Sequence, residues 1–124
     1  MQKVLLIGLA GLLGTLGRYG LSVLVARRFG DSFPAGTLVV NVAGCFLAGL
    51  LFYFLMERNL TSPMMQAVVM IGFLGGFTTF SAFGLQTFAL LREGQLWFAL
   101  LNIVGSNVLG LMMVWAGYAV AKLV

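Results

Sequence analysis

Charged residues are rare along the chain and divide it into four long apolar stretches. The stretches run from Val4 to Ala26, from about Gly36 to Met56, from about Pro63 to Leu91, and from about Gln95 to Ala121. Each is long enough to cross a hydrocarbon layer about 30 Å thick as an α-helix. The connections are too short to hold a soluble domain. The pattern therefore predicts an all-α integral membrane protein with a single four-helix domain over residues 1–124.

The third stretch is too long to cross as one straight helix. No charge lies among the 33 residues between Arg58 and Arg92, which would span roughly 50 Å as an α-helix. In the run Gly75-Gly76-Phe77-Thr78-Thr79, paired glycines followed by threonines make a break least costly. Unwound backbone at that depth must be buried in protein or line a cavity. We therefore expect the third helix to be broken near Gly75–Thr79, and we expect this break to be the functional centre.

The composition excludes several classes of protein. Of the residues, 61% are hydrophobic and only 8% are charged, whereas a soluble domain carries about 25% charged residues. The chain has no histidine, one cysteine and no cluster of acidic residues. The residues that metal-assisted or nucleophilic catalysis requires are therefore not evident. No basic stripe for nucleic acid is present. We therefore expect a membrane protein that is not an enzyme.

All three acidic residues, Asp31, Glu57 and Glu93, fall in the predicted connections. Proton-driven exporters generally use an intramembrane carboxylate as a relay, and cation pores often use acidic rings. The interior is therefore neutral or positive, which suits an anion. Two other classes stay open: a small dual-topology drug exporter of similar length and helix count, and a membrane scaffold that transports nothing.

Several polar side chains within the predicted spans each have two interpretations. Arg18 lies past the middle of the first stretch, where it either anchors the helix by reaching the interface or attracts anions to a vestibule. Asn41 either joins two helices by hydrogen bonds or offers its amide donors to a dehydrated anion. Asn102 and Ser106 are four residues apart and share one helix face, which points toward either a partner helix or a pore.

Phe80 and Phe83 differ from the other phenylalanines because they flank a hydroxyl residue next to the predicted break. Three residues apart on a resumed helix, they would share a face. The positive edge of an aromatic ring stabilises a small anion weakly, and an ion that is held weakly is able to leave. Packing against lipid or against neighbouring helices is the competing interpretation.

Small residues and the charge balance bear on how helices and copies of the chain associate. Glycines recur in the first, second and fourth stretches, where we expect them to let helix backbones approach closely. Lys3, Arg58 and Lys122 flank one side of the predicted membrane, and Arg27, Arg28 and Arg92 flank the other. This balance gives no orientation by the positive-inside rule. Either other signals fix one topology, or copies insert both ways and pair antiparallel.

Three motifs together closely resemble the Fluc/CrcB family of fluoride channels over essentially the whole chain. They are Gly75-Gly76-Phe77-Thr78-Thr79-Phe80-Ser81-Ala82-Phe83, Gly36-Thr37-Leu38-Val39-Val40-Asn41 and Gly17-Arg18-Tyr19. The resemblance implies an antiparallel, dual-topology homodimer in the plasma (inner) membrane of a prokaryote. It also implies a passive, fluoride-selective channel that lowers cytoplasmic fluoride by export.

The resemblance further implies roles for individual residues. Phe80, Phe83 and Asn41 match pore positions, Ser81 and Ser106 match hydroxyls that line the ion path, and Arg18 matches a vestibule residue. The backbone carbonyls of Gly75 and Thr78 match the ligands of a structural sodium ion at the dimer centre, which is not transported. The chain departs from the family pattern at Gln86 (often glutamate), Ala82 (often a hydroxyl residue) and Asn102 (often tyrosine). These departures bear on gating and rate.

Overall fold

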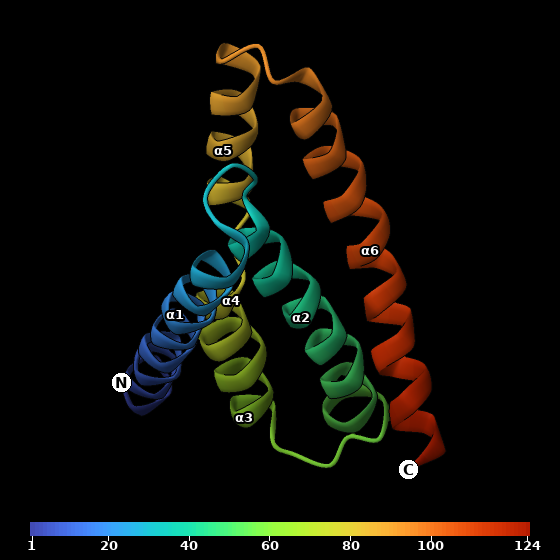
Figure 1. Ribbon diagram of the computed structural model, residues 1–124. Coiled ribbons are helices and arrows are strands. Elements are labelled where there is room, and N and C mark those ends of the chain that lie inside the picture. Colours follow the sequence, from blue (N-terminus) through green and yellow to red (C-terminus); the bar gives the residue numbers. More distant parts are fainter.

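The computed structural model describes residues 1–124 and contains helices and connecting loops only (Figure 1). The elements in chain order are α1 (Gln2–Phe29), α2 (Ala35–Leu51), η1 (Phe52–Glu57), α3 (Pro63–Ala67), η2 (Val68–Leu74), α4 (Gly75–Phe77), α5 (Phe80–Arg92) and α6 (Leu96–Leu123). The two η elements are π-helical continuations of the helices that precede them. The predicted all-helical class is confirmed.

Four helical stretches are long and apolar enough to cross a membrane. They are Gln2–Phe29, Ala35–Glu57, Pro63–Arg92 and Leu96–Leu123. Only 17 of the 124 residues are buried within the single chain, so most apolar side chains face outward. An exposed apolar surface of this extent is what lipid or another membrane protein covers.

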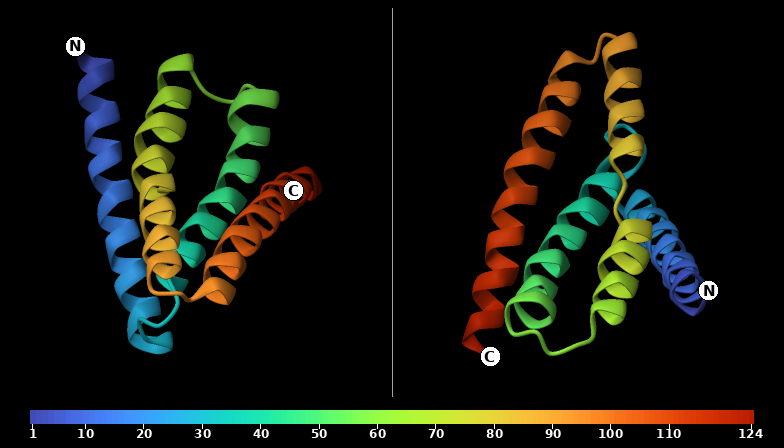
Figure 2. Two further views of the ribbon diagram at one scale, coloured as in Figure 1. Left: turned by 90° about the horizontal axis from the view of Figure 1, so that it is seen from above. Right: turned by 180° about the vertical axis from the view of Figure 1, so that it is seen from behind.

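The third stretch is broken, as the sequence predicts, and the break falls on two threonines. Thr78 (φ −84°, ψ 157°) and Thr79 (φ −151°, ψ 116°) have extended backbone, while Gly75 is still helical (φ −61°, ψ −36°). The hydroxyl of Thr78 donates to the carbonyl of Leu74 at 2.9 Å, within the first half of the stretch. Figure 2 (right) shows the unwound connection between the α3–α4 half and the α5 half.

Gly76, the second glycine of the pair, therefore has a different role from the one that the sequence suggested. A Cβ added at Gly76 would overlap the carbonyl of Gly11, and one added at Gly14 would overlap the carbonyl of Phe73. α1 thus packs backbone against backbone on η2 and α4 (Figure 2, left). A β-carbon at either position would force these elements apart, which is the reason that glycine stands there.

The remaining helices are held together unevenly. α2 packs along most of α6. Gly49 and Gly117 let the two backbones approach there, since a Cβ at either glycine would overlap the backbone of the other helix. α5 contacts the rest of the molecule mainly through α6, to which a short loop joins it (Figure 1). The second half of the broken stretch is therefore the least supported part of the fold.

The start of the third stretch follows from its sequence. Ser62 precedes α3, and its hydroxyl accepts a hydrogen bond from the amide of Met65 at 3.3 Å. Pro63 occupies the first turn, where its missing amide hydrogen costs nothing. Gln66 then ties α3 to η1, across the loop between them, by donating to the carbonyl of Leu55 at 2.7 Å.

Candidate functional site

A cavity of about 430 Å³ lies beside the break, between α2, the η2–α4 half, α5 and α6. Of the eight residues to which the sequence gives a site role, six line it: Asn41, Gly75, Thr78, Phe80, Phe83 and Ser106. No charged side chain lines this cavity, and its remaining walls are mostly apolar. An ion in such a space meets only neutral hydrogen-bonding groups and aromatic rings.

Asn41 joins α2 to the break through two reciprocal hydrogen bonds. Its Nδ2 atom donates to the carbonyl of Thr79 at 2.9 Å, and its Oδ1 atom accepts from the amide of Thr79 at 2.8 Å. The side chain therefore satisfies both backbone groups of an unwound residue, as membrane-depth backbone requires. Of the two interpretations, helix joining is the one that the structure shows, and one Nδ2 hydrogen is left for another acceptor.

Phe80 and Phe83 lie next to each other at the start of α5. Their ring centroids are 5.4 Å apart and their planes are inclined by 39°. Phe80 is 83% exposed in the single chain, while Phe83 is partly buried. Both rings line the cavity, so the two aromatic surfaces stand in sequence along one side of it.

The other two predicted residues lie outside the cavity. Ser81 is exposed, and its Oγ atom lies 3.3 Å from the hydroxyl of Thr79. Arg18 is on α1, with its Nε atom buried and without a hydrogen-bond partner. Neither side chain borders the cavity of the single chain.

Asn102 faces a partner helix and not the cavity. It is 1% exposed and donates through Nδ2 to the hydroxyl of Thr87 at 2.9 Å. Thr87 in turn donates to the carbonyl of Phe83 at 2.8 Å, so a buried polar link joins α6 to the part of α5 that carries the aromatic pair. Ser106 lies 3.5 Å from Oδ1 of Asn102, a long contact that leaves its hydroxyl free to turn.

Sequence reasoning missed Thr79 and Thr87 as members of this arrangement. Thr87 carried a signal, because it is a hydroxyl residue four positions after Phe83 and so lies on the same face of the helix. Thr79 stood inside the predicted break, yet nothing in the sequence named Asn41 as its partner. That pairing joins residues 38 positions apart, which local pattern alone does not reveal.

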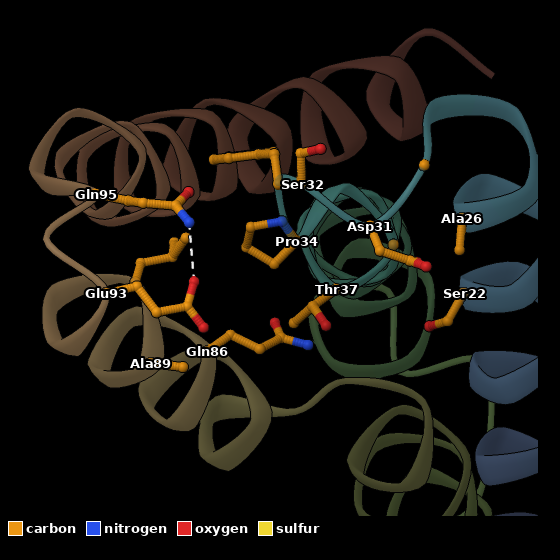
Figure 3. Close-up of a pocket in the computed structure, with 14 residues that line it drawn as sticks. Ser22, Ala26, Asp31, Ser32, Pro34, Thr37, Gln86, Ala89, Glu93 and Gln95 are labelled. Atoms are coloured by element: carbon orange, nitrogen blue, oxygen red, sulfur yellow. Dashed lines mark hydrogen bonds between the residues drawn. The ribbon is translucent and has the colours of Figure 1, made fainter.

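A second cavity, of about 620 Å³, opens at the loop end of α5 (Figure 3). Asp31, Thr37, Gln86 and Glu93 are among its lining residues, and Glu93 accepts a hydrogen bond from Gln95 at 2.8 Å. The Oε1 atom of Gln86 is buried there without a partner. This cavity is larger, but two carboxylates border it, so an anion is better accommodated in the uncharged cavity at the break.

The carbonyl oxygens at the break are suited to a hard cation. The carbonyl of Thr78 accepts no backbone hydrogen bond. The carbonyl of Gly75 would pair with the amide of Thr79 in a regular helix, but that amide donates to Asn41. Unwound backbone carbonyls of this kind coordinate sodium in membrane proteins. The donor set therefore fits sodium, which requires no carboxylate.

The fold and this cavity define a class of protein: a small four-helix membrane protein with a broken third helix beside an uncharged, aromatic-lined cavity. Residues 5–118 match the family model described as "CrcB-like protein, Camphor Resistance (CrcB)". The chain belongs to this family, whose curated members include fluoride-specific ion channels.

Three relatives illustrate the match, and each is named fluoride-specific ion channel FluC. The protein of Solibacter usitatus is 47% identical over 98% of this chain and 99% of its own length. The protein of Geotalea daltonii is 45% identical over 98% of both chains. The protein of Opitutus terrae is 49% identical over 98% of this chain and 93% of its own. The predicted family is confirmed, and it is a family of ion channels and not of enzymes.

Proposed function

We propose that this chain is a passive, fluoride-selective ion channel that lowers cytoplasmic fluoride by export. The observation that carries the proposal is the uncharged cavity at the break, bordered by Phe80, Phe83, Asn41 and Ser106. The names of the relatives support fluoride as the ion. Fluoride enters cells as neutral HF and dissociates at neutral pH, so an open anion pore is sufficient to lower its concentration.

The neutral groups around the cavity replace water around the ion by several weak contacts. Ring edges of Phe80 and Phe83 carry partial positive charge. The remaining Nδ2 hydrogen of Asn41 and the hydroxyl of Ser106 donate hydrogen bonds in the cavity, and the hydroxyl of Ser81 donates one outside it, elsewhere on the proposed ion path. None of these is a full charge, so binding is strong enough for entry and weak enough for release. Arg18 raises the local anion concentration at a vestibule.

The working unit that we propose is an antiparallel homodimer of this single four-helix membrane domain in the plasma (inner) membrane of a prokaryote. The exposure of Phe80 and of Gly75 supports this, since both border the cavity and lie uncovered in one chain. The equal positive charge on the two sides supports insertion in both orientations.

A structural sodium ion belongs to this proposal, with the carbonyls of Gly75 and Thr78 as its ligands. When bound, the ion would supply positive charge that neutralises converging carbonyl dipoles at the centre of the dimer. The chain's own part is to present these oxygens unbonded at the break, and the hydrogen-bond pattern around Thr79 supports that role.

Reconstitution in liposomes tests the proposal directly. Purified protein in fluoride-loaded vesicles should release fluoride to an electrode rapidly, while vesicles loaded with chloride should release almost none. Equal passage of chloride would contradict a selective fluoride pore. Organic-cation transport driven by a proton gradient would support the exporter, and intact dimers without any flux would support the scaffold.

Replacing Phe80 by isoleucine should lower fluoride flux without unfolding the protein. The substitution keeps an apolar side chain and removes the ring edge, so we expect flux to fall about fivefold to tenfold, the scale of one aromatic contact. Phe88→Ile is the matched control, because Phe88 is also exposed on α5 and does not border the cavity. Unchanged flux in Phe80→Ile would remove Phe80 from the pathway.

A further inference from the structure

The backbone around the break contains two amides whose hydrogen bonds go to side chains. In a continuous α-helix the carbonyl of Gly75 would accept from the amide of Thr79 four residues on. That amide donates instead to Oδ1 of Asn41 at 2.8 Å. The side chain of Asn41 has therefore taken the donor that would otherwise satisfy Gly75.

A second amide, three residues later, also donates to a side chain in place of a backbone carbonyl. The carbonyl of Thr78 would accept from the amide of Ala82 in a continuous helix. That amide donates to the hydroxyl of Thr79 at 3.2 Å, which is the cap that begins α5. The carbonyl of Thr78 accepts no backbone hydrogen bond. The side chain of Asn41 thus diverts the first donor, and the side chain of Thr79 diverts the second.

We propose that Asn41 and Thr79 are positioning residues that build a cation site by diverting two amide donors from the carbonyls of Gly75 and Thr78. The inference rests on the proposed sodium ion and explains why its ligands are available. An exposed carbonyl at membrane depth requires a partner, and a monovalent cation meets that requirement when the amides are engaged elsewhere. No carboxylate borders the cavity to compete for the ion.

Asn41 also fixes the direction of the break. Its Nδ2 atom donates to the carbonyl of Thr79 at 2.9 Å, so both backbone groups of Thr79 bind Asn41 and favour the extended conformation. The backbone of Thr79 (φ −151°, ψ 116°) is fully extended. The two diversions are therefore coupled, since the residue whose amide Asn41 binds is the one whose hydroxyl caps α5.

A matched pair of variants separates this role from simple helix capping. Thr79→Ser keeps the hydroxyl and its bond to Ala82, whereas Thr79→Val removes the hydroxyl with little change of shape and leaves the Ala82 amide free to compete for the Thr78 carbonyl. Capping loss alone lowers the melting temperature but does not alter its dependence on sodium. A loss of cation ligands alters that dependence.

The experiment measures thermal unfolding of each purified variant over a range of sodium concentrations, with N-methylglucamine holding ionic strength constant and without fluoride. The sodium midpoint is the sodium concentration that gives half of the full rise in melting temperature. Wild type and Thr79→Ser should show the same sodium midpoint. Thr79→Val should raise that midpoint about tenfold to a hundredfold, the range seen when residues supporting a metal site are removed. An unchanged midpoint in Thr79→Val would overturn the inference.

Two further outcomes keep the proposals apart. Wild-type protein that passes fluoride but gains no stability from sodium would overturn this cation site and leave the channel standing. Wild-type protein that gains stability from sodium but passes no fluoride would overturn the channel and leave the site standing.

Discussion

Replacing Gly14 by alanine is expected to destabilise the protein by about 3 kcal/mol, because the added methyl group enters a contact that cannot yield. An ideal Cβ at Gly14 would overlap the carbonyl of Phe73 and lie 2.9 Å from the amide nitrogen of Phe77. These are backbone atoms of the segment just before the break. Accommodating the methyl group requires α1 to move away from η2 and α4 together.

The consequence for function follows from the position of that segment. η2 and α4 carry Leu74 and Gly75, which border the cavity, so a displaced α1 loosens one of its walls. We expect Gly14→Ala to unfold at a lower temperature in detergent and to lose fluoride flux in liposomes. Circular dichroism during heating measures the first, and the electrode assay measures the second.

Gly8→Ala on the same helix is the control. A Cβ at Gly8 meets no atom within 4 Å, and alanine is the better helix former by about 1 kcal/mol. The control should therefore unfold at or above the wild-type temperature. Equal destabilisation by the two substitutions would show that Gly14 has no special contact and that any methyl group on α1 is harmful.

Asn41→Leu is expected to have the second large effect, since it removes both hydrogen bonds that hold Thr79. Leaving a buried donor or acceptor unpaired costs about 1–3 kcal/mol, and the carbonyl of Thr79 accepts no backbone hydrogen bond that would remain. We expect a loss of about 3 kcal/mol in the free energy of unfolding. We also expect little fluoride flux, because the start of α5 is no longer fixed to α2.

Asn107→Leu is the matched comparison for stability. Asn107 also borders the cavity, but its side chain is exposed and donates only to the carbonyl of Ile103 within its own helix, at 2.7 Å. This substitution should change the unfolding temperature only slightly. If Asn41→Leu melted at the wild-type temperature, the two bonds to Thr79 would not be holding the break.

The sequence predicted those features that depend on local pattern. Four apolar stretches of membrane-crossing length followed from the spacing of charges. The broken third helix followed from an uncharged run too long for one straight span. The helix start at Ser62-Pro63 followed from the preferences of capping residues.

Other features depend on contacts between distant segments and were not predictable. The break lies on Thr78 and Thr79, with the preceding glycines helical, because Gly76 is needed for contact with Gly11 on another helix. The orientation of Asn102 was open, since a helix face alone does not say whether it meets a neighbour or a cavity. Its bond to Thr87 is the contact that decides this.

The π-helical segment η2 has a consequence for which deletions and substitutions the protein tolerates. A π-helical turn is equivalent to one residue inserted into an α-helix. Deleting one residue within η2 would remove that surplus and let the segment close into a regular α-helix, with the parts on either side left in register. Gly72 and Gly76, which both meet α1, would continue to face it. Loss of one residue is therefore tolerable in this segment, whereas substitution of Gly72, where a Cβ would lie 2.7 Å from the carbonyl oxygen of Ile7, is not.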